Sequence, residues 1–596
     1  MTFKRLQKLL ISSVAIMLVL TSFALLTGTS TASSGGTTSE ALTVGLVSSG
    51  PVVTMNPLYP GGQSAILTSQ LTGIMYLSLL QQAPNGTLQP QLASSWNVNS
   101  NATQFTFNLK PDLKWSNGLP LNTSDIAYTF NLFMNNSLLD AFNGFEVGSL
   151  IKNITIVNQT TIIFNLKHSF ASFLEYAGLG KVIVPKSQFS TISNLTNYSN
   201  SGSPIGDGPY VLENWTPGAS VLRFYANPYF YLGKPKLSQV DVQILSSSSN
   251  IPSLLSSGSI DLAQPLPSQI ASLSGVANIS VSIAPGNSIF GTYFDPAYLL
   301  MYNNEMYPYN VTAVKQAIAY SINRTEIVHL GLSGQGTIGS QGQLPLSLSS
   351  WIPTNLPNYT FNPSKAENIL TSLGFKKNSN GFFDFPNGTL WKPNILNTGG
   401  VESNIVSIIV QNLQSAGIDA QQETITTGTL VSALEYGNFN MLILETSRPP
   451  IPSFVLGVFA SNQTTPTGTA ELNYHGWTRW TNSTFLNDLN QALLTGNSTL
   501  QHNYYSNAQE IAATQLPLIT LAYGSSVWAY SNATVHGWNI ARSGYQFPQA
   551  NLLYNLYTSV QPVTTSNNDI YIVAGVVVAI AIIGGALTYS RRKKNE

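Results

Sequence analysis

The chain has 596 residues, 43% of them hydrophobic and 10% aromatic, which is enough for at least two domains and excludes wholesale disorder. Only 8% are charged, against about 25% in an average protein, and 25 Lys and Arg balance 25 Asp and Glu. A net charge of zero argues against a nucleic-acid partner, which requires a basic surface. Cysteine is absent, which excludes disulfides, thiolate metal sites, a cysteine nucleophile and a lipid-anchor cysteine.

The N-terminus has the pattern of a secretory signal. Lys4, Arg5 and Lys8 precede an apolar run at residues 9–26, and small residues follow it. This order of basic, apolar and small segments predicts a signal peptide over residues 1–32. The alternative is an N-terminal anchor that remains uncleaved.

The C-terminus has the pattern of a membrane anchor. Residues 570–589 carry no charge, and a helix of that length reaches across a bilayer. Basic residues follow at once, so the positive-inside rule places the tail, residues 590–596, in the cytoplasm. We therefore expect a single-pass protein of the cell membrane with an extracellular body and a Ser- and Thr-rich tether at residues 558–569.

The acceptor motif for N-glycosylation, N-x-[S/T], recurs along the whole exported part. Many matches arise by chance in a chain so rich in Asn, Ser and Thr, but their number suits an exported glycoprotein. The motif occurs at Asn85, Asn101, Asn122, Asn135, Asn153, Asn158, Asn194, Asn197, Asn214, Asn278, Asn310, Asn323, Asn358, Asn387, Asn462, Asn482, Asn497 and Asn532.

Predicted strands and helices alternate along the exported part, which is typical of an α/β fold. Alternating apolar residues predict strands, and apolar residues three and four positions apart predict helices. In chain order these segments are strand 42–47, helix 66–80, strands 154–157 and 161–166, a Gly-Pro turn entering a strand at 206–215, strand 240–244, helices 311–330, 362–374 and 405–416, strand 418–425, helix 504–515 and strand 518–523.

Turn-forming residues divide the segment from residue 105 to 130 into separate elements. Its first five residues alternate, which predicts a half-buried strand. Trp115 is expected to pack beneath a turn made by Asn117 and Gly118. Thr123 or Ser124 is expected to cap a helix that begins near residue 125. The segment thus predicts a strand, a tight turn and a capped helix, all structural features.

Matches to motifs of catalysis and cofactor binding are incomplete in this chain. Residues 334–339 read GQGTIG, but a dinucleotide loop needs a strand before it and a helix after it, and here a helix precedes and SQGQLPL follows. The five histidines have no metal-ligand spacing, and no G-x-S-x-G motif occurs. No pair of carboxylates stands out as a glycosidase pair. The sequence therefore predicts no enzyme, no cofactor and no metal.

A family resemblance rests on six segments in a fixed order. They read PQLASSWNVNSNATQFTFNLKPDLKWSNGLPLNTSDIAYTF, PIGDGPYVLENW with YANPYFYLGKPKLSQVDVQIL, LLSSGSIDLA, VTAVKQAIAYSINRTEIV, FNPSKAENILTSLGF and IVQNLQSAGIDAQQETI. Together they resemble the family 5 extracellular solute-binding proteins of ABC importers, the dipeptide/oligopeptide-binding class, over residues 41 to 545. The tether and C-terminal helix resemble those of archaeal-type members.

The resemblance implies a two-lobed, periplasmic-binding-protein-like α/β fold of the large, three-subdomain type, with a ligand cleft between the lobes. Residues 41–285 and a return segment, 520–557, would form lobe I, and residues 286–519 would form lobe II. It also implies capture of oligopeptides or oligosaccharides and their delivery to a membrane permease. Hinge closure over the ligand belongs to this repertoire.

One departure from the family bears on the ligand. Peptide-binding members typically carry an Asp after the strand that corresponds to residues 440–444, where it pairs with the free amine of the peptide. This chain has no Asp there; Glu445 is a substitute, and Arg448 would repel an amine. Because aromatic faces and neutral polar groups suit such a cleft, the expected ligand contacts are Trp477, Trp351, Trp528, Glu445, Thr446 and Arg448.

Purely structural roles are the alternative for two of these residues. Trp528 would serve the core equally well, and Glu445 would pair with Arg448. Two other functions also stay open: an extracellular hydrolase, which would turn over peptide or oligosaccharide, and a structural protein of the cell surface, which would bind no small ligand.

Overall fold

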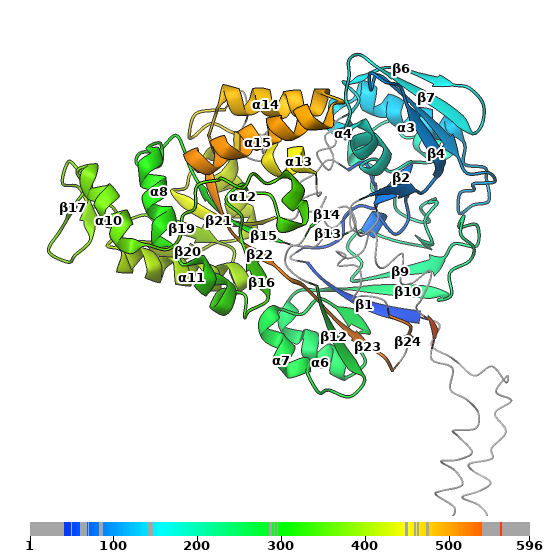
Figure 1. Cartoon of the computed structure of the whole chain (residues 1–596). Coiled ribbons are helices and arrows are strands. Elements are labelled where there is room, and N and C mark those ends of the chain that lie inside the picture. The colour runs from blue at the N-terminus through cyan, green and yellow to red at the C-terminus, as the bar shows by residue number, and fades with distance from the viewer. Residues whose placement is uncertain are drawn as a thin grey trace, which may run out of the picture. The chain divides into compact units, whose positions relative to one another are not determined.

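The structure, a computed structural model, describes residues 41–48, 50–59, 68, 71–82, 87–140, 147–284, 289–290, 293–294, 296–446, 451–457, 461, 464–471, 476–533, 535–538 and 561–562. All of these residues belong to one compact unit, Ala41–Pro562. Three larger sheets, each covered by helices or loops, organise this unit (Figure 1).

The largest sheet has seven strands in the order β12-β23-β11-β1-β10-β9-β8. β1 pairs in parallel with β10 and β11, and the remaining pairs are antiparallel. Leu42 and Val44 of β1 are fully buried, as expected for the predicted strand 42–47. The strands are β1 (Ala41–Val47), β8 (Tyr210–Leu212), β9 (Val221–Ala226), β10 (Gln239–Leu245), β11 (Leu262–Ala263), β12 (Ile279–Ala284) and β23 (Ser526–Ser531).

A second sheet has six strands in the order β16-β22-β15-β21-β19-β20. β15 lies inside this sheet and is buried along its whole length. The strands are β15 (Ala297–Tyr302), β16 (Gly336–Ile338), β19 (Asn394–Asn397), β20 (Gln421–Thr424), β21 (Met441–Thr446) and β22 (Leu518–Gly524).

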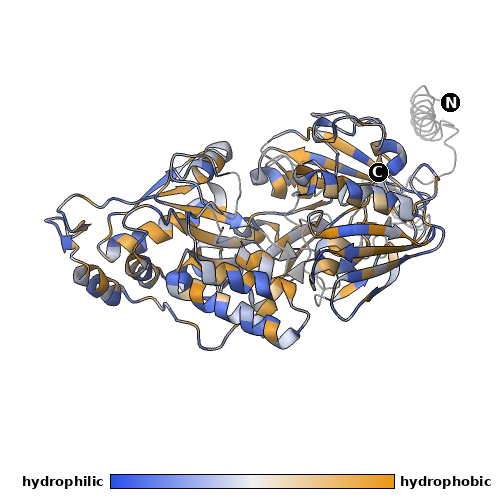
Figure 2. Ribbon diagram, turned by 90° about the horizontal axis from the view of Figure 1, so that it is seen from above, coloured by the Kyte–Doolittle hydropathy of each residue, from blue (hydrophilic) through white to orange (hydrophobic). Residues whose placement is uncertain are grey.

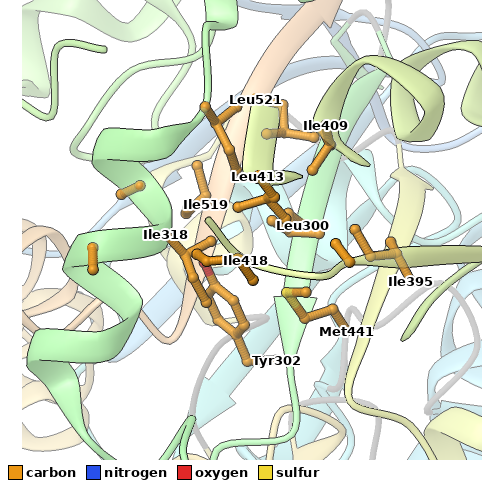
Figure 3. Close-up of a cluster of buried hydrophobic side chains, with 14 of the residues drawn as sticks. Leu300, Tyr302, Ile318, Ile395, Ile409, Leu413, Ile418, Met441, Ile519 and Leu521 are labelled. Atoms are coloured by element: carbon orange, nitrogen blue, oxygen red, sulfur yellow. The ribbon is translucent and has the colours of Figure 1, made fainter. Parts of the chain in front are cut away.

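Helices cover both faces of the six-stranded sheet because β15 alternates between two cores. Leu300 and Tyr302 pack with α8 (Thr312–Ser321), α10 (Pro363–Ser372) and α11 (Gly400–Ser415) in the cluster of Figure 3. Leu299 and Met301 face the other core, which contains α12 (Thr427–Tyr436), α14 (Ser483–Leu494) and α15 (Ser498–Gln515). The helices in Figure 2 carry both hydrophobic and hydrophilic residues, as packing on one side requires.

The third sheet has four antiparallel strands in the order β4-β5-β7-β6. Its inner face packs on α3 (Thr123–Asn135) through a core rich in phenylalanine. The ring centroids of Phe130 and Phe164, for example, are 4.7 Å apart. The strands are β4 (Ala93–Val98), β5 (Gln104–Leu109), β6 (Ile151–Ile156) and β7 (Thr161–Leu166).

The predicted turn and capped helix after β5 are present, with one correction. Trp115 is buried, and its carbonyl accepts from the amide of Gly118, whose φ is +83°. The cap of α3 is Asn122, not Thr123 or Ser124. The Asn122 side chain accepts from the Ser124 amide, and the Asp125 carboxylate accepts from the Asn122 amide, so a capping box begins the helix at Thr123, before the expected start near residue 125.

The helix predicted over residues 66–80 is wrong in its second half. The chain leaves helical geometry by Gly73 and enters β2 (Leu80–Gln82). The carbonyl of Met75 accepts from the amides of Asp207 and Gly208, and the Asp207 carboxylate accepts from the amide of Leu77. These tertiary hydrogen bonds replace the helical ones that the local apolar spacing indicates.

The two larger sheets are connected twice. The chain passes from β12 to β15 through two short strands, and it returns from β22 to β23 with only Ser525 between them. The remaining elements are β2, β3 (Leu88–Pro90), α4 (Ser137–Asp140), η2 (Leu174–Leu179), α5 (Lys186–Phe189), η3 (Leu195–Asn197), η4 (Ser248–Asn250), α6 (Ile251–Ser256), η5 (Pro267–Gln269), α7 (Ile270–Leu273), β13 (Ile289–Phe290), β14 (Tyr293–Phe294), α9 (Arg324–Glu326), η6 (Ile327–Gly331), η7 (Leu346–Trp351), β17 (Lys376–Lys377), β18 (Phe383–Asp384), α13 (Pro452–Gly457), β24 (Val535–His536) and β25 (Gln561–Pro562).

Candidate ligand-binding site

The carboxyl ends of three strands meet at one edge of the six-stranded sheet. β19 is parallel to β21, and β15 is antiparallel to both β21 and β22, so β19, β21 and β22 all point the same way. In open α/β sheets ligands bind in the crevice outside the carboxyl ends of the strands. The residues that end these strands are therefore candidate ligand contacts.

Glu445 lies at this edge, next to the last residue of β21. Its side chain is exposed to water, and its partner across the strands is the buried Tyr298 of β15. The surrounding protein and the neighbouring Glu402 raise the pKa of Glu445 to about 7, while a hydrogen bond with the Tyr298 side chain opposes the rise. Glu445 is thus an accessible carboxyl at the end of a strand whose charged form is disfavoured by lost hydration and by a neighbouring acid.

Glu402 is fixed beside it by the first turn of α11. One carboxylate oxygen, Oε2, accepts from the amide and the hydroxyl of Thr398, at 2.9 and 2.6 Å. The other, Oε1, accepts from the main-chain amide of Glu445 at 3.0 Å. Gly399 and Gly400, with φ of +93° and +57°, turn the chain from β19 into the helix at this point. Three hydrogen bonds and the helix N-terminus thus fix the position of the Glu402 side chain.

A second part of the site joins the two lobes. η2 is a π-helix that follows the four-stranded sheet, and α13 follows β21 after the undescribed residues 447–450. The ring centroids of Tyr176 and Phe454 are 5.1 Å apart, and the Tyr176 hydroxyl lies 3.4 Å from Ser453 Oγ. π-helical turns are frequent at functional sites. This contact brings segments about 280 residues apart to one place.

Glu175 lies in the same π-helix and has an unusual environment. Its Oε2 is buried and has no hydrogen-bond partner. Burial raises the pKa of Glu175, and burial is also the main cause that raises the pKa of Tyr505 in α15, with a smaller contribution from the nearby Glu175. Because an unpaired charge inside a protein is costly, this environment favours the protonated form of Glu175.

The residues expected from the sequence are placed as follows. Thr446 ends β21 beside Glu445 and is half-buried. Trp477 is half-buried, and its Nε1 donates to the Glu471 carbonyl at 3.1 Å. Trp351 is stacked on His502 with ring centroids 5.7 Å apart and meets Tyr505 edge-on at 5.5 Å. Trp528 is 5% exposed in β23, within the core of the seven-stranded sheet. Arg448 lies outside the described residues.

Sequence reasoning missed several side chains of this site. Tyr298 reads as a core residue, and its register opposite Glu445 follows only from the sheet. Glu402 was not among the expected site residues. A Glu in the first turn of a helix that follows a strand and two glycines could have indicated it, because such a position suits a carboxylate. Glu175, Ser453 and Tyr505 come from three distant segments, and no local pattern links them.

Two predicted features concern metals and membranes. Among the described residues, no group of three or more His, Asp or Glu side chains is placed to hold a metal ion. No helix in that same part of the chain is long and apolar enough to cross a membrane. The expected signal peptide, membrane helix and tail fall outside the described residues, and so does the tether except for Gln561 and Pro562, which form β25 and pair with β24.

The three sheets and the two connections between the larger ones define a two-lobed α/β fold of the periplasmic-binding-protein type. The chain belongs to the bacterial extracellular solute-binding proteins, family 5, whose model matches residues 87–465. The resemblance drawn from the sequence is thus confirmed at the level of the family, and so is the fold class.

Known relatives and solved structures agree with this assignment. The peptide transport periplasmic protein SapA of Salmonella typhimurium is 25% identical over 512 residues, which cover 81% of this chain and 87% of SapA. The glutathione-binding protein GsiB of Shigella flexneri is 24% identical over 484 residues, or 78% and 86% of the two chains. A mannohexaose-bound oligopeptide-binding protein of Thermotoga maritima has a TM-score of 0.72 at 20% identity, and nonapeptide-bound AppA of Bacillus subtilis has 0.70 at 18%. Each covers 88% of this chain, which covers 99% of each structure.

Proposed function

We propose that this protein captures oligopeptides outside the cell for an ABC importer, and that Glu445 holds the free amine of the peptide. The observation that carries the proposal is an exposed carboxyl with a raised pKa at the carboxyl ends of the strands. The names of relatives point the same way, since SapA is a peptide transport protein, GsiB binds glutathione and AppA was solved with a nonapeptide.

The local charges favour a cationic group at this place. The neighbouring Glu402 makes ionisation of Glu445 less favourable in the empty protein. Among the described residues, Glu445 forms no ion pair with Lys, Arg or His. An ammonium group, with three donors and one positive charge, supplies what the pair lacks.

Calorimetry with a matched pair of ligands tests the proposal. The full chain is titrated with trialanine and with N-acetyl-trialanine, which lacks the ammonium. We expect trialanine to bind and the acetylated peptide to bind at least tenfold more weakly. Glu445→Gln should abolish this difference, whereas Glu213→Gln, a change at an exposed acid after β8, should preserve it. Equal binding of both peptides by the wild type would refute the role of Glu445.

A second candidate ligand is an oligosaccharide. The support is the mannohexaose-bound relative of Thermotoga maritima and the half-buried rings of Trp351 and Trp477. Sugars bind by stacking on aromatic rings and by hydrogen bonds. If Trp477→Ala weakens binding by about 1–3 kcal/mol, as for an aromatic anchor, and Glu445→Gln has no effect, the sugar is the better answer. The reverse outcome favours the free-amine peptide.

The remaining proposals concern the setting of the binding unit. Residues 570–589 anchor the chain in the archaeal-type manner, and the basic tail faces the cytoplasm. The partner is the permease of an ABC importer, and the protein does not turn its ligand over. Protease added to intact cells should digest the body and spare the tail, and protection of the whole chain would refute this topology. Release of amino acids from trialanine would instead support the hydrolase alternative.

A further inference from the structure

Threonine follows asparagine at the glycosylation spacing far more often than composition explains. The chain has 55 Asn, 52 Thr and 69 Ser among 596 residues. In random order these numbers would produce about five N-x-T and about six N-x-S motifs. The chain contains 14 N-x-T and 4 N-x-S motifs. The excess therefore lies in the threonine motif alone, and abundance of polar residues does not account for it.

Three of the threonine motifs share one geometry in the structure. In each, the Asn side chain is exposed, and its Oδ1 accepts from both the amide and the hydroxyl of the Thr in its own motif. The pairs are Asn158 with Thr160 at 2.9 and 3.0 Å, Asn194 with Thr196 at 3.1 and 2.6 Å, and Asn387 with Thr389 at 3.0 and 2.7 Å.

This geometry leaves the amide nitrogen available. The two hydrogen bonds fix the direction of Oδ1, so Nδ2 of the same amide points the other way. Within the described part of the chain, Nδ2 of Asn158, Asn194 and Asn387 donates no hydrogen bond. The three turns lie in different places: one joins β6 to β7, one follows α5, and one follows β18.

We propose that Asn158, Asn194 and Asn387 carry N-linked glycans. In the modification, Nδ2 bonds to the anomeric carbon of a sugar that is carried on a polyprenyl phosphate or pyrophosphate. The bond from that carbon to the phosphate oxygen breaks, the lipid phosphate leaves with the electron pair, and one amide proton passes to a base of the transferase. Membership of an extracellular family places the body of the protein where such glycans occur.

The low charge of the chain gives a physical reason for glycosylation. With 8% charged residues and no net charge, the surface gains little solubility from ionised groups. Glycans are bulky and strongly hydrated, and they replace that contribution. The alternative is that N-x-T is used here only as a turn motif, since Asn and Thr also stabilise turns by themselves.

The chain provides internal controls for the two explanations. Asn122 and Asn482 also lie in acceptor motifs, but both are half-buried and cap helices with Oδ1. A glycan at these positions would have to fit against the first turn of α3 or α14. We expect them to be unmodified in the same molecules in which the three exposed sites are occupied.

The test is glycopeptide mapping by mass spectrometry of the full chain purified from its native cells. We expect sugar mass increments on the peptides that contain Asn158, Asn194 and Asn387. Asn158→Gln and Thr160→Ala should each remove the increment at that turn, whereas Thr160→Ser, which preserves the motif, should retain it. Unmodified peptides at all three sites would overturn the proposal, as would equal occupancy of Asn122 and Asn482.

Discussion

The main-chain amide of Glu445 donates to Oε1 of Glu402 at 3.0 Å, which fixes two acidic residues from β21 and α11 side by side. Glu402 is buried and fully engaged, whereas the Glu445 side chain is exposed. The strand therefore ends in a single accessible carboxyl whose charge is disfavoured by its neighbour. A positively charged ligand reverses that penalty, which is the physical basis of the predictions for this site.

Peptide affinity should depend on pH near neutrality. Glu445 must be ionised to pair with an ammonium, and its pKa in the empty protein is about 7. Affinity for trialanine should therefore rise from pH 5 as Glu445 ionises and fall again above about pH 8, where the peptide amine loses its own proton, with a net release of protons on binding near or below pH 7. Calorimetry in buffers of different ionisation enthalpy measures that proton. In Glu445→Gln the affinity should be weak and independent of pH over this range.

The empty protein should be more stable in mild acid than at pH 8. Lost hydration raises the pKa of Asp125, Glu175, Asp207 and Asp488, and it also raises that of Glu445 together with the neighbouring Glu402. The native state then retains protons that the unfolded chain has lost, so the free energy of unfolding falls as pH rises from the ordinary carboxyl range towards the raised values. For Glu445 this window runs from 4.5 to about 7.

Thermal unfolding across pH measures this dependence. We expect Tm to be highest near pH 4–5 and lower at pH 8. Glu445→Gln removes one of the penalties, so its Tm should exceed that of the wild type at pH 8 and match it at pH 4. Marked unfolding of the wild type between pH 5 and 4 would contradict the account.

Closure of the lobes should respond to Glu175. Its unpaired carboxyl must be neutral to be buried beside Ser453 and Tyr505. Glutamine resembles the protonated acid but never ionises, so Glu175→Gln should favour the closed form at pH 8 and change little at pH 5. Small-angle scattering and ligand affinity report closure. A weaker ligand affinity of the variant at pH 8 would show that Glu175 acts as a charge instead.

The loop from Gly206 to Gly208 should tolerate no side chain. A Cβ on Gly208 would lie 2.2 Å from the carbonyl oxygen of Ile74, and one on Gly206 would lie 2.3 Å from that of Met75. Gly208→Ala should therefore reduce the free energy of unfolding by about 1–3 kcal/mol, as overpacking does. Gly496→Ala is the matched control, because a Cβ there meets nothing within 4 Å. Denaturant titration distinguishes the two variants.

The elements with strong local patterns could be predicted from the sequence, and those decided by tertiary contacts could not. The alternation of Phe105 and Phe107 marks β5 because one face of the sheet is buried. The segment around Met75 has helical spacing, but hydrogen bonds to a loop more than 130 residues away decide its course. Trp528, an expected ligand contact with a core role as its alternative, is a buried residue of β23.

The candidate ligand-binding site could be predicted from the sequence only through the family pattern. That pattern directed attention to Glu445 and Thr446, which do end β21. It could not indicate Glu402 or Tyr298, because their proximity to Glu445 depends on the pairing of β15 with β21 and on the turn before α11. The family pattern could not indicate Glu175 either, because a residue of the other lobe, Tyr505, forms part of its environment.

The most direct test of peptide capture is mass spectrometry of the ligand that remains bound when the full chain is purified from its native cells. The account predicts a set of short peptides with free N-termini, which should be absent from Glu445→Gln purified in the same way. A preparation that instead carries oligosaccharides, in the wild type and in Glu445→Gln alike, would contradict it.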